Sequence, residues 1–191
     1  MVHSGRPVLT VITPSLNHGR FIGVAIASAR LPAALPFEHL VIDAASTDET
    51  AAVLAGWPHL QVHVQPALDS HEALNHALAL AQGEVIGFLN ADDRYEPGAL
   101  EHVLAYFSAH PEAEVLCGGL RVFTDDGAGE QDVARFLHCP PASMGLEMTF
   151  GNPGFNSWFF RRSLLQRLDG FRGDVPPDVE IGLSALPALS R

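Results

Sequence analysis

Four short apolar segments, each followed by a polar loop and a helical pattern, divide the chain between residues 8 and 110. The apolar segments cover residues 8–12, 39–42, 60–64 and 85–89. Helical patterns follow at residues 21–29, 72–81 and 99–110, and Ser46 and Glu49 form a capping-box pattern for a helix that runs through Ala55. This alternation predicts an α/β fold of Rossmann-like architecture, with a parallel sheet, right-handed crossovers and helices on both faces.

The composition predicts one globular domain over residues 1–191. Hydrophobic residues make up 47% of the chain and charged residues 17%, which suffices for one substantial core. The formal net charge is -11 with only 11 Lys and Arg, which argues against nucleic acid as a partner. The chain shows neither a signal-peptide pattern nor an apolar run of about 18 residues. We therefore expect a cytoplasmic protein without a transmembrane segment, for which peripheral membrane contact stays open.

Two common binding patterns are absent from the sequence. No Gly-x-Gly-x-x-Gly follows the first apolar segment, where the loop reads TPSLNHG over residues 13–19, so a dinucleotide-binding dehydrogenase is not indicated. Cys117 and Cys139 lack a paired metal or redox spacing, and the ten histidines show no spacing typical of a zinc site.

Polar side chains follow three of the predicted strands at their carboxyl ends. Thr13 and Ser15 follow the first strand, Asp43 the second, and Asp92 with Asp93 the fourth. Open α/β sheets bind ligands just beyond these strand ends. Two adjacent carboxylates there suit a divalent cation that carries phosphates. Asp is also a common turn residue, so a turn at Asp93 and an Asx-turn or helix cap at Asp43 are alternatives.

Three ordered motifs resemble those of family 2 glycosyltransferases. They read TPSLN at residues 13–17, VIDAASTD at residues 41–48 and FLNADD at residues 88–93, and the similarity runs from residue 8 to about residue 180. The resemblance implies the GT-A fold, with a nucleotide-binding half at about residues 8–110 and an acceptor-side half at about residues 111–191. It also implies an inverting enzyme of polysaccharide biosynthesis, which moves a sugar from a UDP-, dTDP- or GDP-sugar to a glycan or lipid-linked acceptor.

The resemblance assigns roles to individual residues. Asp43 resembles the aspartate that contacts the base, Asp93 the ligand of a Mg²⁺ or Mn²⁺ ion, and Asp92 a ribose or metal contact. Asp178, in the segment PPDVE at residues 176–180, resembles the general base, although an aspartate after two prolines is also a natural helix N-cap. The residues implied around the donor nucleotide are Thr13, Pro14, Ser15, Asn17, Asp43, Ser46 and Asp92.

The sequence also departs from the family pattern. Leu16 stands where an aromatic residue is common, Ala44 and Ala45 replace a glycine, Ala67 stands where an aspartate is frequent, and the chain ends soon after Asp178. Two rivals therefore stay open. One is a non-catalytic or partner-dependent nucleotide-sugar-binding protein, in which Asp178 would be dispensable. The other is a sugar nucleotidyltransferase, which would need a Gly-rich or basic phosphate loop near the first strand.

The α/β rhythm ends after residue 110. Residues 115–117 and 120–124 are predicted as strands, and residues 125–153 as a long irregular stretch in a substrate-facing half. The aromatic residues of the 151–158 segment suit stacking on a sugar. Trp158, Phe159 and Phe160, however, are more typical of a buried strand, because aromatic side chains contribute large buried areas.

Overall fold

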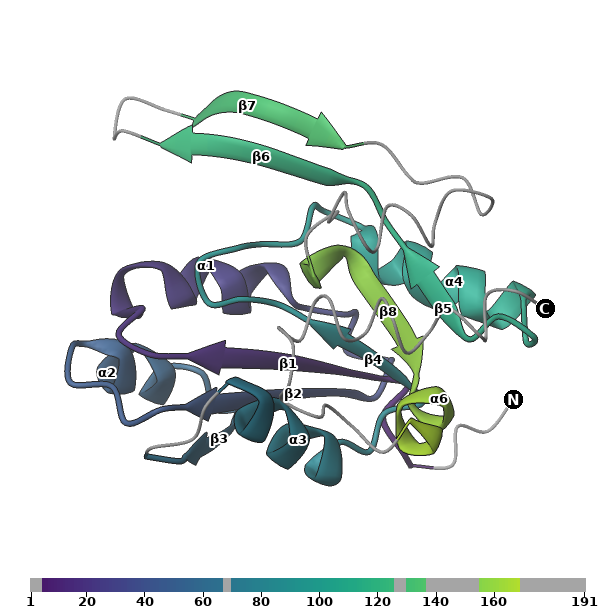
Figure 1. Cartoon of the computed structure of the whole chain (residues 1–191), viewed down its shortest axis with the longest axis horizontal. Coiled ribbons are helices and arrows are strands. Elements are labelled where there is room, and N and C mark those ends of the chain that lie inside the picture. Colours follow the sequence, from purple (N-terminus) through teal and green to yellow (C-terminus); the bar gives the residue numbers. More distant parts are fainter. Residues whose placement is uncertain (1–4, 67–69, 126–129, 137–154, 169–191) are drawn as a thin grey trace.

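A six-stranded sheet forms the centre of the protein in the computed structural model, which describes residues 5–66, 70–125, 130–136 and 155–168 (Figure 1). Its strands are β1 Leu9–Ser15, β2 Phe37–Asp43, β3 Gln61–Val64, β4 Val85–Phe88, β5 Val115–Cys117 and β8 Trp158–Arg161. The order is β3-β2-β1-β4-β8-β5. The first four of these run parallel, and β8 runs antiparallel to both neighbours. The predicted α/β fold with a mostly parallel sheet is confirmed.

Helices cover both faces of the sheet, as the sequence predicts (Figure 1). They are α1 Gly19–Ser28, α2 Thr50–Ala55, α3 Ser70–Leu80, α4 Ala99–Ala109 and α6 Arg162–Arg167, with a 3-10 turn, η1, at Phe155–Ser157. On one face, α1 and α2 pack on Val41, and α1 and α4 pack on Leu9 and Val11. On the other face, α3 and α6 pack on Ile12 and Leu40. Within the described ranges, no helix has the length and apolar character that crossing a bilayer requires.

The strand β8 fits beside β4 because Gly87 leaves room for an aromatic ring. Gly87 is paired with Phe159, and a Cβ atom at this glycine would lie 2.7 Å from the Phe159 ring. Trp158, Phe159 and Phe160 are all buried. These three aromatic side chains therefore belong to the core and do not form an exposed platform for a sugar. The antiparallel pairing also places the start of β8 beside the end of β4.

A hairpin of two strands, β6 Leu120–Asp125 and β7 Glu130–Phe136, forms a second sheet that stands away from the first (Figure 1). The prediction of irregular structure from residue 125 onward is wrong for β7. This strand is largely polar, so it lacks the apolar run that marks a strand in the sequence, and its order comes from pairing with β6. Residues 126–129 and 137–154 of the same stretch lie outside the described residues.

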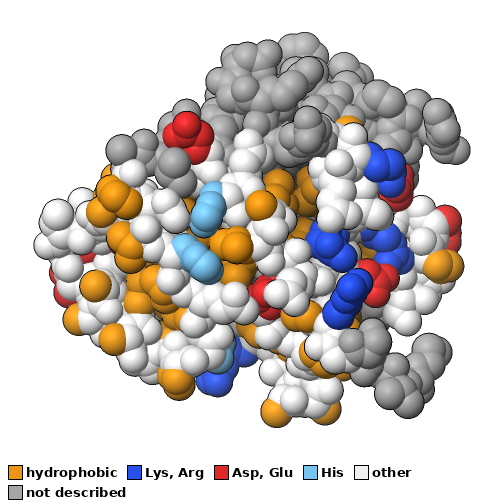
Figure 2. All heavy atoms as spheres, turned by 90° about the horizontal axis from the view of Figure 1, so that it is seen from below, with side chains coloured by type: hydrophobic (Ala, Val, Ile, Leu, Met, Phe, Trp, Pro, Cys, Tyr) orange, Lys and Arg blue, Asp and Glu red, His pale blue; other side chains and the backbone are white. Residues whose placement is uncertain are grey.

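The edge strand β3 carries exposed apolar side chains. Hydrophobic side chains gather on the face of the molecule seen from below (Figure 2). Val62 and Val64 of β3 are 40% and 59% exposed. The strand has only four residues, and such short edges limit pairing with other chains.

Candidate functional site

Side chains predicted as site residues meet at the carboxyl edge of the sheet. Ser15, the last residue of β1, pairs in register with Asp43, the last residue of β2. On its other side β1 pairs with β4, and the chain continues from β4 through Asn90 to Asp92 and Asp93. The structure therefore brings the polar ends of three parallel strands together, at the place where open α/β sheets bind ligands.

Hydrogen bonds connect the loops that follow β1 and β2. The Asn17 N–H donates to Oγ of Ser46 at 2.8 Å, and the Thr47 N–H donates to Oδ1 of Asn17 at 2.8 Å. Asn17 and Ala45 both have left-handed backbones, with φ of 56° and 61°. Asn17 and Ser46, both predicted at the donor site, thus fix the two loops against each other.

Both carboxylate oxygens of Asp43 accept hydrogen bonds from Ser46. The Ser46 N–H lies 2.8 Å from Oδ2, and the Ser46 hydroxyl lies 2.6 Å from Oδ1. Asp43 is 5% exposed. This is the local turn that the sequence left as an alternative, but a carboxylate offers about four lone-pair positions and the turn uses only two. The remaining positions have no partner among the described residues, so they can accept further N–H groups.

The capping box predicted at Ser46 and Glu49 is wrong. The helix α2 begins at Thr50, and Glu49 makes no side-chain capping bond. Asp48 replaces the box, because its Oδ1 accepts the Thr50 N–H at 3.0 Å and the Thr50 hydroxyl at 2.5 Å. The bond from the Thr50 hydroxyl is the main cause that holds the pKa of Asp48 below its ordinary value. The box does not form because α2 begins only at Thr50, so Glu49 takes the N-cap position and Ser46 lies four residues before the helix.

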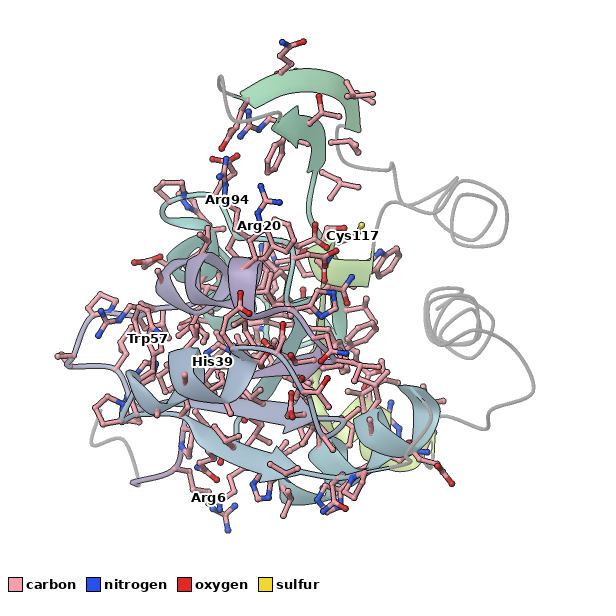
Figure 3. The ribbon with its side chains drawn as sticks, turned by 90° about the vertical axis from the view of Figure 1, so that its left-hand side faces the viewer. Arg6, Arg20, His39, Trp57, Arg94 and Cys117 are labelled. Carbon is pink, nitrogen blue, oxygen red and sulfur yellow. The ribbon has the colours of Figure 1, made fainter. Side chains whose placement is uncertain are left out.

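Two buried polar atoms beneath this edge have no hydrogen-bond partner in the described part of the chain: Oγ of Ser15 and Nδ1 of His39. The other ring nitrogen of His39 lies 2.9 Å from the Thr13 hydroxyl. Burial, with a smaller effect of His59, lowers the pKa of His39 to about 3, so the ring is neutral at neutral pH. Figure 3 shows His39 inside the layered part of the molecule. The Thr13 side chain therefore supports the interior, whereas Ser15 places an unsatisfied hydroxyl at the strand end.

The two adjacent aspartates differ in their surroundings. Asp92 is exposed and Asp93 is half-buried. Oδ2 of Asp93 accepts hydrogen bonds from Nδ2 of Asn90 at 3.3 Å and from Nδ2 of Asn156. Burial, and next the charge of Asp92, raise the pKa of Asp93 above its ordinary value. Among the described residues, no positively charged side chain offsets these two effects on the Asp93 carboxylate.

The donor set at these aspartates fits a divalent cation that is shared with phosphates. No cage of three or more His, Cys, Asp or Glu side chains occurs in the described ranges. A Mg²⁺ ion that carries substrate phosphates needs only one or two carboxylates from the protein. Asp92 and Asp93 supply that number, and the raised pKa of Asp93 marks a charge that a cation would neutralise.

Asn156 is a site residue that the sequence analysis missed. It lies 63 positions after Asp93 in the chain, yet its side chain contacts the Asp93 carboxylate. The only signal for this contact is the register of β8, because pairing Phe159 with Gly87 brings the start of β8 to the end of β4. That pairing is a long-range feature, which local sequence patterns do not carry.

The segment after Asp93 is tied to the hairpin. Arg94 forms an ion pair with Glu130 at 2.5 Å, and Arg121 forms one with Glu96 at 3.2 Å. Both guanidinium groups lie over the Phe123 ring, at 4.6 Å and 5.1 Å from its centroid. Figure 3 shows Arg94 at the side of the molecule that carries the hairpin. The loop that carries the aspartates and the hairpin thus form one connected structure.

A cavity of about 540 Å³ lies near these carboxylates but does not include them. The second half of α1 and the segment from Arg94 to Glu101 line it. Asp43, Asp92 and Asp93 do not contribute to its walls. The cavity is therefore separate from the edge at which the predicted site residues meet.

Asp178 lies outside the described residues, as do Ala67 and the start of the 151–158 segment. The role of Asp178 as general base therefore stays a prediction from the resemblance.

A mostly parallel sheet with carboxylates at its strand ends is typical of the class of α/β proteins that bind ligands at the carboxyl edge of the sheet. The sequence model of Glycosyl transferase family 2 matches residues 10–168, and the chain belongs to this family. The uncharacterized protein MT1568 of Mycobacterium tuberculosis (strain CDC 1551 / Oshkosh) is 28% identical in an alignment 200 positions long, gaps included, that covers 94% of this chain and 61% of that protein.

Two solved structures share the fold. The mannosyltransferase PcManGT from Pyrobaculum calidifontis, in complex with GDP-Man and Mn²⁺, has a TM-score of 0.68 at 22% identity and covers 93% of this chain. S. aureus TarS 1–349 in complex with UDP-GlcNAc has a TM-score of 0.70 at 22% identity and also covers 93%. The matched regions are 51% and 52% of those two chains. The present chain therefore spans about half the length of these structures.

Proposed function

We propose that this chain forms the donor-binding part of an inverting glycosyltransferase of polysaccharide biosynthesis. The observation that carries the proposal is the meeting of Asp43, the unpartnered Ser15 hydroxyl and the Asp92–Asp93 pair at one sheet edge. Family membership supports transferase chemistry. The GDP-Man and UDP-GlcNAc in two structures of the same fold support a nucleotide-sugar donor. The proposed donor is a UDP-, dTDP- or GDP-sugar, and the proposed acceptor is a glycan or lipid-linked acceptor.

The proposed domain covers residues 1–191 and has two halves. Residues 8–110 hold the donor, because β1, β2 and β4 deliver the polar strand ends. Residues 111–191 contact the acceptor. The ion pairs from Arg94 and Arg121 support this division, since they connect the hairpin of the second half to the aspartate loop of the first.

Each donor-side residue has a distinct proposed role. The free lone pairs of Asp43 accept an N–H of the base, and the Ser15 hydroxyl contacts the base or the ribose. Asn17 and Ser46 keep the two loops in position through their hydrogen bond. The other residues proposed at the donor are Thr13, Pro14 and Asp92.

Asp93, together with Asp92, is proposed to hold Mg²⁺ or Mn²⁺ against the donor diphosphate. When bound, the cation acts as a Lewis acid on the departing diphosphate. Because the chain carries a net charge of -11, an anionic donor needs such a bridge to approach this acidic protein.

Inversion requires a single in-line displacement at the anomeric carbon, with the base behind the acceptor oxygen and the diphosphate leaving on the opposite side. Asp178 is the proposed base that takes the proton of the acceptor hydroxyl. A positioned base of this kind contributes a rate factor of about 100 to 10,000.

Calorimetric titration of UDP, dTDP and GDP into the purified protein tests the donor site. Each nucleotide is titrated with Mn²⁺, with Mg²⁺ and then with a chelator. We expect one nucleotide to bind, with higher affinity when the cation is present, because the cation joins the diphosphate to Asp92 and Asp93. Absence of binding by all three nucleotides under every condition would contradict the proposal.

A further inference from the structure

The side-chain amide of Asn156 bridges two groups of the loop that follows β4. Its Oδ1 accepts the Asn90 N–H at 2.7 Å, and its Nδ2 donates to Oδ2 of Asp93. A backbone N–H can only donate and a carboxylate only accepts, so these two partners fix the orientation of the amide. Asn156 is 9% exposed, so the bridge is largely shielded from water.

Asn156 lies in η1, the turn that leads directly into β8. Gly87 of β4 is paired with Phe159 of β8, and continuing this antiparallel register by three residues sets Asn156 opposite Asn90. The N–H of Gly118, the residue after β5, donates to the Ser157 carbonyl at 2.7 Å and holds the turn against β5. Asn156 is therefore fixed by the main sheet.

We propose that Asn156 is a positioning residue for Asp93. Asn156 and Asn90 both donate to Oδ2 of Asp93, which fixes the carboxylate plane and leaves Oδ1 as the oxygen for a cation. Side chains that hydrogen-bond to metal ligands orient those ligands in this way. Asn156 acts through Asp93 and does not itself touch the cation or the donor. The inference rests on the proposed function, because it requires a cation at Asp93.

Both halves of the chain contribute to the proposed cation site. The proposed ligand Asp93 lies in the first half of the chain, whereas the amide that orients it comes from the turn η1, directly before β8, in the second half. Cation binding therefore depends on the correct pairing of β8 with β4, as well as on the aspartates themselves.

The test is a Mn²⁺ titration of the full chain. The electron paramagnetic resonance signal of free Mn²⁺ reports how much of the ion is bound. The titration is performed with excess UDP, dTDP or GDP, whichever the wild-type protein binds. We expect Asn156→Ala to weaken Mn²⁺ binding about 10- to 100-fold, the usual effect of losing a group that orients a metal ligand. Binding of the same nucleotide in chelator is expected to stay unchanged.

Ser157→Ala is the matched control, because it removes a buried polar side chain at the next position of the same turn. We expect it to keep wild-type Mn²⁺ affinity. If Asn156→Ala does not fold, Asn156→Gln takes its place. This variant keeps the amide but displaces it by one methylene, so it is expected to fold and to bind Mn²⁺ more weakly.

Three results would count against the inference. Wild-type Mn²⁺ affinity in the folded Asn156 variant would overturn it. An equal loss of nucleotide binding with Mn²⁺ and in chelator would also overturn it, because it would show a general structural role. A wild-type protein whose nucleotide binding does not respond to Mn²⁺ would instead overturn the proposed function, and the inference with it.

Discussion

At the scale of single residues, the turn that presents Asp43 contains a strained backbone. Ala45 has a φ of 61°, in the left-handed region that favours glycine. A residue with a Cβ atom bears a cost of about 1–2 kcal/mol there. Ala44 and Ala45 stand where the family resemblance implies a glycine, and Ala45 is the position where glycine would relieve strain. The hydrogen bonds of Asn17 and Ser46 keep the loop in shape despite this cost.

Replacing each alanine by glycine separates strain from flexibility. Ala45→Gly is expected to raise the free energy of unfolding by about 1 kcal/mol, because it removes the left-handed penalty. Ala44→Gly is expected to lower it by roughly 0.5–1 kcal/mol, because Ala44 has no positive φ and glycine adds only freedom to the unfolded chain. Urea denaturation measures both. Equal changes in the two variants would contradict this account of the loop.

At the scale of elements, a buried polar network joins β1 and β2 at the end opposite the site. Glu38 is 4% exposed and accepts the Thr10 hydroxyl at 2.5 Å and the Gln82 N–H at 2.9 Å. The Thr10 oxygen accepts the Gly83 N–H at 2.8 Å. Because Thr10 lies near the start of β1 and Ser15 at its end, this network stabilises the sheet without contacting the donor edge.

Thr10→Val tests that separation. The change leaves the Gly83 N–H without its acceptor and removes one donor from Glu38, so we expect the free energy of unfolding to fall by about 1–3 kcal/mol. Nucleotide affinity of the folded protein is expected to stay the same. Thr10→Ser keeps the hydroxyl and should restore most of the stability. A loss of nucleotide affinity in folded Thr10→Val would show that the two ends of the sheet are coupled.

Prediction from the sequence succeeded where elements are local. The four apolar segments and the helices after them carry their own periodicity, so the parallel part of the sheet could be predicted. The strand β7 and the antiparallel place of β8 depend on pairing with distant strands, which periodicity does not encode. The contact of Asn156 with Asp93 was missed for the same reason. The predicted capping box is wrong because α2 begins at Thr50, beyond the position that Ser46 could cap.

At the scale of the whole molecule, the polar ends of β1, β2 and β4 form one edge, and two parts of the second half meet it. The hairpin reaches the aspartate loop through Arg94 and Arg121. The turn η1, directly before β8, contacts the same loop through Asn156. The proposed donor site is therefore assembled from both halves of the chain. We propose that the main role of Asp93 is to bind a cation together with the donor, and that its part in the turn is secondary.

Nucleotide titration of Asp93→Asn, with Mn²⁺ and with chelator, tests this claim most directly when combined with thermal unfolding. Burial and the charge of Asp92 disfavour ionised Asp93. Replacing this carboxylate by a neutral amide should therefore not lower the unfolding temperature. We predict that the increase in nucleotide affinity caused by Mn²⁺ is lost while the affinity in chelator is kept. A lower unfolding temperature with the full Mn²⁺ effect retained would contradict the claim and assign Asp93 to the turn.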